Sequence, residues 1–277
     1  MALVYVDGAL VEPEAARVSV FDHGLVAGDG VFETVLVHEG RPFALSRHLD
    51  RLARSAAGLG IAPLDLAQVR GAVEAVVATA DEPEGRLRLT VTAGRGPLGS
   101  GRERVAPTVI VALGPLDHDP RELASVATVP WPRNERGALA GLKTTSYAEN
   151  ALALAWASAR GAHEAIFANT AGQLCEGSGS NVFVVLDGEL LTPPLRSGCL
   201  AGVTRALLLE RVGGEERDLA ITDFRAGRLD EAFLASTIRG VQPIGAIDGE
   251  ALGGAPGPVT TQAASAYREL LATSEDP

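Results

Sequence analysis

The 277-residue sequence predicts an α+β fold in two domains, and three observations support this prediction. Apolar residues make up 46% of the chain and charged residues 21%, a balance typical of a globular protein that buries its own core. Runs with strand character and runs with helical spacing occur throughout. A stretch at 114–120, rich in proline, glycine and aspartate, interrupts this pattern as a linker does. We therefore expect a small N-terminal domain over 1–115, a linker over 116–123 and a larger C-terminal domain over 124–277.

The N-terminal part combines two strand hairpins with two helices. Strand-like residues over Val4–Val11 and over Val31–Leu45 are each interrupted by an acidic residue followed by glycine, at 7–8 and at 39–40. Ser46 then offers a helix N-cap, and the apolar residues after it recur at helical spacing. A second helix is expected over 65–80, followed by strands over 86–93 and 105–113.

The C-terminal part is expected to contain more strands than helices. A short strand near Val126 precedes the segment around Lys143, and a helix is expected over 148–160. Apolar runs joined by polar turns then predict a series of strands. These strands span 164–168, 173–175, 181–186, 189–192 and the region 232–247, and further helices are expected over 203–212 and 259–271.

The charge and the cysteine count argue against several classes of protein. A formal net charge of −11 disfavours a nucleic-acid partner, because binding to phosphate backbones requires a basic surface. The first residues lack the pattern of a signal peptide, and no apolar run approaches membrane-spanning length, so a cytoplasmic protein without a membrane partner is expected. Cys175 and Cys199 have no neighbours at metal-ligand spacing, so we expect two buried thiols and no metal site.

Lys143 is the only lysine in a chain that otherwise uses arginine for positive charge. A desolvated lysine can lose its proton and attack a carbonyl group to form a Schiff base, whereas a guanidinium stays protonated. The alternative is that biased codon usage replaced surface lysines by arginine and this one remained. A nucleotide-binding loop is excluded, because Leu142 stands where that motif requires glycine before the lysine.

Other segments could hold a ligand with a pyridine ring and a phosphate. Glu176, in a run of small residues between two strands, could keep a ring nitrogen protonated. Gly198–Thr204 leads into a helix whose backbone amides could bind an anion, and Ser236–Gly240 ends a strand with two hydroxyl groups. Each could equally be an ordinary turn or cap, and Arg51 could be a solvated arginine. Together with Lys143, however, they are the components of a pyridoxal-phosphate site.

The motifs that carry these residues resemble the fold-type IV pyridoxal-phosphate enzymes, which include D-amino-acid transaminases, branched-chain transaminases and aminodeoxychorismate lyases. The resemblance covers nearly the whole chain. It implies a small α/β N-terminal domain, a larger pseudo-barrel C-terminal domain and a homodimer. The motifs are Gly28–Thr34, the helix start at Arg47–Leu52, Gly141–Lys143, Glu176–Phe183, Leu200–Arg205, and Ser236-Thr237 ahead of Pro243.

The same resemblance implies roles for individual residues. Lys143 would be the catalytic residue, which carries pyridoxal 5′-phosphate as a Schiff base and moves a proton during the reaction. Glu176 would pair with the pyridine nitrogen. The cofactor-binding residues that the resemblance implies are Arg51, Lys143, Tyr147, Glu176, Ser180, Asn181, Leu200, Val203, Thr204, Thr237 and Ile238.

Substrate recognition departs from the patterns common in the family. Ala27 stands where an aromatic residue often precedes the Gly-Asp-Gly motif, and 97–101 lacks the Arg and His that bind carboxylates in many D-amino-acid transaminases. We expect Arg88 and Arg239 to bind the substrate carboxylate instead, because a guanidinium suits bidentate binding. Arg86 shares a strand face with Arg88, so at least one of the two is expected to be solvated.

The expected activity is the transfer of an amino group between an amino acid, of D configuration, and a 2-keto acid. The alternative is an aminodeoxychorismate lyase, which forms 4-aminobenzoate and pyruvate, because Asp29–Thr34 and Ile238–Pro243 resemble both kinds of enzyme. Two arginines could equally bind a dicarboxylate. A non-enzymatic binding protein of the same fold would need no reactive lysine, so the pairing of Lys143 with Glu176 argues against it.

Overall fold

The computed structural model describes residues 2–103, 105–116 and 123–277, which pack as two units. The first unit takes in the described residues up to 116, together with Leu142–Tyr147 and Ser274–Pro277, and the second contains 123–141 and Ala148–Thr273. The two short segments in the first unit come from the predicted C-terminal domain, 124–277. Most of the predicted linker, 116–123, lies outside the described residues. No helix in the described part of the chain is long and apolar enough to cross a membrane.

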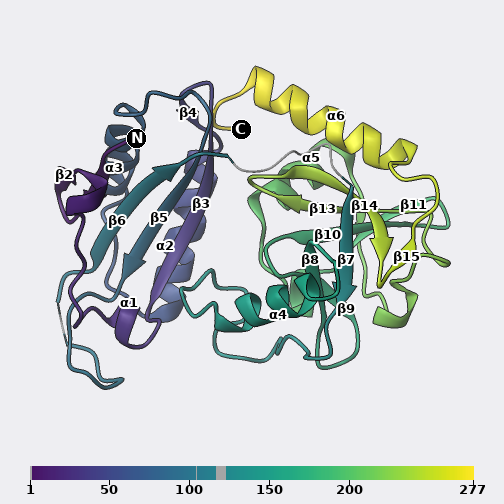
Figure 1. Ribbon diagram of the computed structural model, residues 1–277, viewed down its shortest axis with the longest axis horizontal. Coiled ribbons are helices and arrows are strands. Elements are labelled where there is room, and N and C mark those ends of the chain that lie inside the picture. The colour runs from purple at the N-terminus through teal and green to yellow at the C-terminus, as the bar shows by residue number, and fades with distance from the viewer. Residues whose placement is uncertain (1, 104, 117–122) are drawn as a thin grey trace. The chain divides into compact units, whose positions relative to one another are not determined.

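The first unit is built on a six-stranded sheet with the order β2-β1-β6-β5-β3-β4 (Figure 1). All its pairings are antiparallel, and both predicted hairpins are present. The second strand of the β3–β4 hairpin is only two residues long. The strands are β1 (Val4–Val6), β2 (Ala9–Val11), β3 (Gly30–His38), β4 (Arg41–Pro42), β5 (Gly85–Thr92) and β6 (Thr108–Gly114).

Two helices, α2 (Leu45–Leu59) and α3 (Leu66–Val77), cover one face of this sheet and form its core. The Asp65 side chain caps α3 by accepting hydrogen bonds from two backbone amides. The sequence predicted Ser46 as the N-cap of α2, but the helix begins two residues earlier than that, at Leu45, and Ala44 is at the N-cap position. Instead, the amide and the hydroxyl of Ser46 both donate to the carboxylate of Asp276, so a residue from the chain's end replaces the cap.

Strand alternation divides β3 and β5 into two faces. Val31, Val35 and Leu89 point into the core beneath the helices, whereas Phe32 and Arg88 lie on the opposite face. The register places Phe32 opposite Thr90 and Thr34 opposite Arg88, so Phe32 and Arg88 are diagonal neighbours. Neighbouring residues of the motif Gly28–Thr34 therefore lie on opposite faces of the sheet.

Backbone hydrogen bonds join the segment that carries Lys143 to β3 of this unit. The Phe32 amide donates to the Lys143 carbonyl at 3.0 Å, and the Thr145 amide donates to the Gly30 carbonyl at 2.8 Å. An isolated bridge also joins Val31 to Thr144. These backbone bonds explain why residues distant in sequence pack within the first unit.

The second unit contains a nine-stranded, strongly curled sheet with the order β12-β11-β10-β13-β14-β7-β8-β9 and β15 paired with β14 (Figure 1). It mixes parallel pairs, such as β7 with β8, with antiparallel hairpins. Its strands are β7 (Ala124–Thr128), β8 (Glu164–Ala168), β9 (Leu174–Gly177), β10 (Asn181–Leu186), β11 (Glu189–Thr192), β12 (Glu215–Glu216), β13 (Glu231–Ser236), β14 (Gly240–Ile247) and β15 (Glu250–Ala251).

Both faces of β10 and β13 in this sheet are buried, which is why these two strands are nearly continuous apolar runs. Val182, Val184 and Leu234 face one core, while Phe183 and Phe233 stack on the other side with ring centroids 4.9 Å apart. The helices are α4 (Ala148–Ser158), α5 (Val203–Val212) and α6 (Pro258–Thr273), and these three predictions are confirmed to within a few residues. The short helices α1 (His23–Val26), η1 (Pro13–Ala15), η2 (Leu195–Ser197) and η3 (Ile221–Asp223) were not predicted. The α+β prediction is confirmed.

Candidate functional site

In the first unit, Lys143 lies beside two aromatic rings. Its Nζ atom is 4.2 Å from the centroid of the Phe32 ring and 6.0 Å from that of Tyr147. The two rings meet edge to face with centroids 5.3 Å apart, and the Lys143 amide donates to Ser55 Oγ at 3.2 Å. The backbone is thus fixed while the amine lies against apolar carbon, a setting that favours a reactive amine over a fully hydrated one.

Arg88 shares the same ring. Its guanidinium carbon lies 3.3 Å from the Phe32 centroid, and its Nε donates to Thr90 Oγ1 at 3.3 Å. Among the described residues, none forms an ion pair with Arg88. Arg88 and Arg86, which lies two residues earlier on the same face, are both exposed. The structure therefore brings together a primary amine and a guanidinium around one phenyl ring.

On the opposite face of β3, Arg51 is buried rather than solvated. Its Nε donates to Glu33 Oε1 at 2.8 Å and its Nη2 to Glu33 Oε2 at 2.6 Å, while His48 Nδ1 lies 2.7 Å from Oε2. Burial alone would raise the pKa of Glu33, but the charge of Arg51 and the hydrogen bonds from Arg51 and His48 lower it to about 2. Burial also lowers the pKa of His48. Arg51 is consequently held rigidly by an ionised carboxylate.

Sequence reasoning missed Glu33 and His48, although a signal was present. Glu33 alternates with Val31 and Val35 on the core face of a strand, and a carboxylate in that position requires a cationic partner. Arg51 on the helix that packs against this face is that partner. The remaining predicted residue of this unit, Ala27, follows α1 and is exposed.

In the second unit, Glu176 lies at the end of β9 with two groups bound to its carboxylate. Oε2 accepts a hydrogen bond from the Leu200 amide at 2.9 Å, and Oε1 is 3.5 Å from Arg133 Nε. Arg133 also lies over the Phe167 ring at 4.2 Å and donates to Glu149 at 2.6 Å. Arg133, which sequence reasoning did not identify, therefore provides a positive charge next to the predicted partner of the ring nitrogen.

The loop before α5 offers a place for an anion. Gly202 precedes the helix without a side-chain cap, and a Cβ atom there would lie 1.9 Å from Asn181 Oδ1. Asn181 Nδ2 donates to the Leu200 carbonyl at 2.9 Å, and Thr204 is buried at the first turn. The Ser180 hydroxyl is buried and finds no hydrogen-bond partner among the described residues. An orphaned hydroxyl and an open helix N-terminus are features of an anion-binding loop.

Thr237 and Ile238 lie in the tight turn that connects β13 to β14, where Ser236 pairs with Gly240. Arg239 in the same turn donates through Nη2 to Glu164 Oε2 at 2.6 Å. Glu164 is buried, so the carboxylate that Arg239 binds in this structure is an internal one. The geometry therefore does not support the prediction that Arg239 binds a substrate carboxylate, since the guanidinium already holds a carboxylate.

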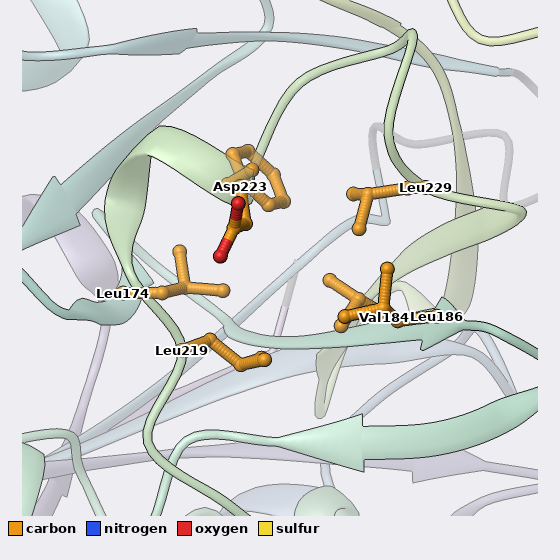
Figure 2. A pocket seen from close by; sticks show the side chains of 7 residues that line it. Leu174, Val184, Leu186, Leu219, Asp223 and Leu229 are labelled. Carbon is orange, nitrogen blue, oxygen red and sulfur yellow. The ribbon is translucent and has the colours of Figure 1, made fainter.

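Three negative observations limit the alternatives. Within the described ranges, no three His, Cys, Asp or Glu side chains are grouped as a metal site would require. Figure 2 shows a pocket of the second unit, but its lining is apolar except for Asp223, and it has no room for a water molecule. Cys175 and Cys199 are both buried and free, as predicted. Burial raises the pKa of both thiols, that of Cys199 to about 11.

Known proteins with similar sequences share one reaction class. A putative branched-chain-amino-acid aminotransferase from Methanocaldococcus jannaschii is 32% identical over 90% of this chain and 89% of that protein. A bifunctional aminodeoxychorismate lyase / D-amino acid transaminase from Mycobacterium tuberculosis is 34% identical over 83% of this chain and 84% of that protein.

A solved structure and a family model agree with these relatives. The structure of a hypothetical aminotransferase from Mycobacterium tuberculosis, in a PLP-bound form, matches with a TM-score of 0.85 and 31% identity, covering 96% of this chain and 98% of that one. The predicted fold-type IV architecture is thus confirmed. The family model for amino-transferase class IV matches residues 30–247. This chain therefore belongs to the class IV aminotransferases, which are enzymes that use pyridoxal 5′-phosphate.

Proposed function

We propose that this enzyme transfers the amino group of a D-amino acid to a 2-keto acid, with Lys143 bound to pyridoxal phosphate as a Schiff base. The observation that carries the proposal is the sharing of the Phe32 ring by Lys143 and Arg88, 4.2 Å and 3.3 Å from its centroid. An amino-acid substrate presents a carboxylate and an α-carbon joined by one bond. A guanidinium and a proton-accepting amine around one ring suit these two groups.

The residues present fit the cofactor. The buried Ser180 hydroxyl without a partner and the open N-terminus of α5 at Val203 and Thr204 suit its phosphate. Glu176 suits its ring nitrogen, because the hydrogen bond from the Leu200 amide and the contact with Arg133 hold its carboxylate in place. The full set that we propose to hold the cofactor is Arg51, Lys143, Tyr147, Glu176, Ser180, Asn181, Leu200, Val203, Thr204, Thr237 and Ile238.

When bound, pyridoxal phosphate supplies an electron sink for the charge that develops on the substrate α-carbon. The chain's own residues perform the remaining steps. Arg88 binds the substrate carboxylate and so orients the α-hydrogen. Lys143 Nζ would remove this proton and later give it to the cofactor carbon that receives the amino group, and Phe32 and Tyr147 would keep water from the amine. Ala27 in place of an aromatic side chain leaves room for larger substrates.

We assign carboxylate binding to Arg88 in preference to Arg239. Arg88 has an aromatic ring beneath it and no ion-pair partner among the described residues, so its Nη1 and Nη2 donors are available to a ligand, while Nε donates to Thr90. Arg239 is already paired with Glu164. The predicted role of Arg239 in substrate binding thus has weaker support than that of Arg88.

Aminodeoxychorismate lyase activity is the second candidate, and the bifunctional relative at 34% identity favours it. The same groups could start both reactions, since each begins with removal of a proton from the carbon that bears the amino group. The lyase would then release pyruvate and form 4-aminobenzoate. One enzyme could therefore carry out both reactions, as the name of that relative states for it.

A homodimer is also proposed, because each unit exposes apolar side chains that a second copy would cover. In the first unit, the exposed apolar residues are Val20, Phe21, Leu25 and Leu98. Leu98 is two residues after Gly96, whose amide donates to the Phe21 carbonyl, so Leu98 lies near Phe21. In the second unit, Trp131, Leu152 and Leu154 are exposed. Light scattering should give twice the chain mass, and a monomer would contradict this proposal. A cytoplasmic location remains a prediction.

The test of function is titration of the cofactor-loaded enzyme with D-alanine and, separately, with L-alanine, L-valine and L-leucine, while the absorbance of the bound cofactor is followed. We expect D-alanine to convert the cofactor to its amine form with release of an equal amount of pyruvate. Conversion by the L-amino acids alone would replace our proposal by a branched-chain activity. No conversion by any of them, with 4-aminobenzoate formed from aminodeoxychorismate, would make the enzyme a lyase.

A further inference from the structure

Glu164 is a buried carboxylate at the start of β8 that three donors satisfy. Ser178 Oγ and the Gly179 amide donate to its Oε1 at 2.9 and 2.6 Å, and Arg239 Nη2 donates to its Oε2 at 2.6 Å. Its side chain is 4% exposed. A carboxylate so far from water is stable in its ionised form only with such donors and a cation. The Glu164–Arg239 pair is therefore part of the internal structure rather than a surface ion pair.

The guanidinium of Arg239 is bound on all sides within its own unit. Besides the bond to Glu164, Nη1 donates to Gln242 Oε1 at 3.3 Å, and Nε donates to Ser236 Oγ at 3.4 Å. The side chain is 16% exposed. Arg239 thus links Ser236, at the start of its own turn, and Gln242, in β14, to the carboxylate of a distant strand.

Glu164 and Arg239 join two turns that lie next to the paired ends of β10 and β13, where Asn181 is opposite Ala235. One is Ser236–Gly240, which contains Thr237 and Ile238. The other is the turn at Ser178–Gly179, between Glu176 and Ser180. Close packing supports this link, because a Cβ atom at Gly177 would lie 2.7 Å from Glu164 Oε1. Glycine at 177 leaves the space through which the carboxylate reaches the second turn.

We propose that Arg239 and Glu164 are positioning residues that fix the Thr237–Ile238 turn and the Ser178–Ser180 turn together for binding of the cofactor phosphate. This inference rests on the proposed function only in naming the phosphate as the ligand. The proposal differs from a role of Arg239 in substrate binding in what a mutation should change. If Arg239 bound the substrate, its loss would lower the affinity for amino acids. If it fixes the turns, its loss lowers the affinity for a phosphate ester.

The test compares Arg239→Met, Glu164→Gln and the double variant with the unchanged enzyme. Apo-protein is titrated with pyridoxal phosphate and with pyridoxal, which lacks the phosphate, and binding is followed by absorbance and protein fluorescence. We expect each single change to weaken binding of pyridoxal phosphate by about tenfold or more, and binding of pyridoxal by less than about twofold. The double variant should be no weaker than the weaker single one, since both remove the same link.

Arg239→Lys gives a further readout, because a lysine ammonium can still pair with Glu164 but cannot also reach Gln242 and Ser236. Partial recovery of phosphate-ester affinity is expected. Arg228→Met is the matched control: it breaks the exposed Arg228–Asp187 pair of the same unit, and binding should not change. Glu164→Gln keeps the side-chain shape and remains informative if Arg239→Met fails to fold.

Two results would overturn the inference. Unchanged binding of pyridoxal phosphate by Arg239→Met, with a tenfold higher KM for D-alanine at saturating cofactor, would make Arg239 a substrate-binding residue. Equal weakening of pyridoxal and pyridoxal phosphate would mean that the pair merely supports folding. Because these binding measurements need no turnover, a failure of D-amino-acid transamination leaves them interpretable, while a wild-type protein that binds no pyridoxal phosphate would refute the cofactor assignment itself.

Discussion

Cationic side chains have different partners on the Phe32 face of the first unit's sheet and in the turns of the second unit. Around Phe32, Lys143 and Arg88 lie against an aromatic ring, and the structure shows no carboxylate paired with Arg88 in the described residues. In the second unit, Arg239 and Arg133 lie in ion-pair contact with Glu164 and Glu176. Cations of the first kind can bind a reactant, and cations of the second kind hold the protein's own carboxylates in place.

This difference assigns different consequences to mutation in the two regions. Under the proposed function, loss of a cation beside Phe32 would remove an interaction with a reactant and would leave no buried charge behind. Loss of Arg239 leaves Glu164 buried without its cation, which typically destabilises a protein strongly. The first region should therefore control turnover and substrate affinity, and the second should control binding of the cofactor and stability.

The largest effect is expected at Lys143. Lys143→Ala should lower kcat by about 10⁴-fold or more, because both covalent attachment and proton transfer depend on the amine. The melting temperature of the apo-protein should stay within about 2 °C, since the bonds that fix this segment, from the Phe32 amide to the Lys143 carbonyl and from the Lys143 amide to Ser55 Oγ, involve only the lysine backbone. Lys143→Arg, which keeps the charge but not the nucleophile, serves as the control and should be equally inactive. Turnover by either variant with any amine donor would contradict the assignment.

The first unit also has a buried carboxylate with a cationic partner, on the other face of β3. A substitution of Glu33 tests how much this pair stabilises the fold. The pKa of Glu33, lowered from 4.5 to about 2, means that its contribution to stability is present above pH 4.5 and is lost as the pH falls towards 2. The shift corresponds to about 3 kcal/mol of unfolding free energy. Glu33→Gln should therefore be less stable at pH 7, by a similar amount, and should lose less stability on acidification.

Urea unfolding between pH 7 and pH 3 checks this expectation. The matched control is Glu84→Gln, which removes an exposed carboxylate bonded to His38 and should change stability by less than about 1 kcal/mol. Parallel acid sensitivity in wild type and Glu33→Gln would show that other carboxylates govern acid unfolding.

Arg88 should show a smaller and more selective effect. Arg88→Met should raise KM for amino acids by about 10-fold to 100-fold, the range expected for loss of hydrogen bonds to a charged group. An amine donor without a carboxylate should be affected by less than about threefold. Arg86→Met is the control, because Arg86 is an arginine of the same strand face, two residues from Arg88 and equally exposed. Equal losses for both donors would remove Arg88 from carboxylate binding.

The sequence predicted the elements well and the partners of its arginines poorly. Helices and hairpins follow from local signals, such as the Asp65 cap and the turn at 7–8, which need no distant contact. Lys143 and Glu176 could be identified because their residue types are unusual in their surroundings. The roles of Arg51, Arg88 and Arg239 could not be separated, because each depends on whether a carboxylate from a distant segment reaches it.

Glu33 and Glu164 illustrate this limit. Strand alternation places Glu33 on a core face, so its need for a cation was predictable, but the choice of Arg51 over the other arginines of the same helix was not. Glu164 begins an apolar strand, and nothing local indicates that a residue 75 positions later would pair with it. Such pairings depend on how strands are ordered in the folded sheet, and only the structure provides that order.

The smallest effect is expected from the two thiols, although Cys175 is adjacent to Glu176. Burial raises the pKa of both, and Cys199 Sγ lies 3.6 Å from the Pro194 carbonyl. With a pKa of about 11, fewer than about one in a thousand Cys199 thiols is ionised at pH 8, and only the thiolate reacts with alkylating reagents. Iodoacetamide at pH 8 should therefore leave activity unchanged over an hour, and mass spectrometry should find neither thiol modified.

A reagent that acylates amines should inactivate the apo-enzyme at Lys143 under the same conditions. Rapid alkylation of Cys175 with loss of cofactor binding would show that the second unit opens readily, and would remove the distinction between a fixed frame there and reactive groups beside Phe32.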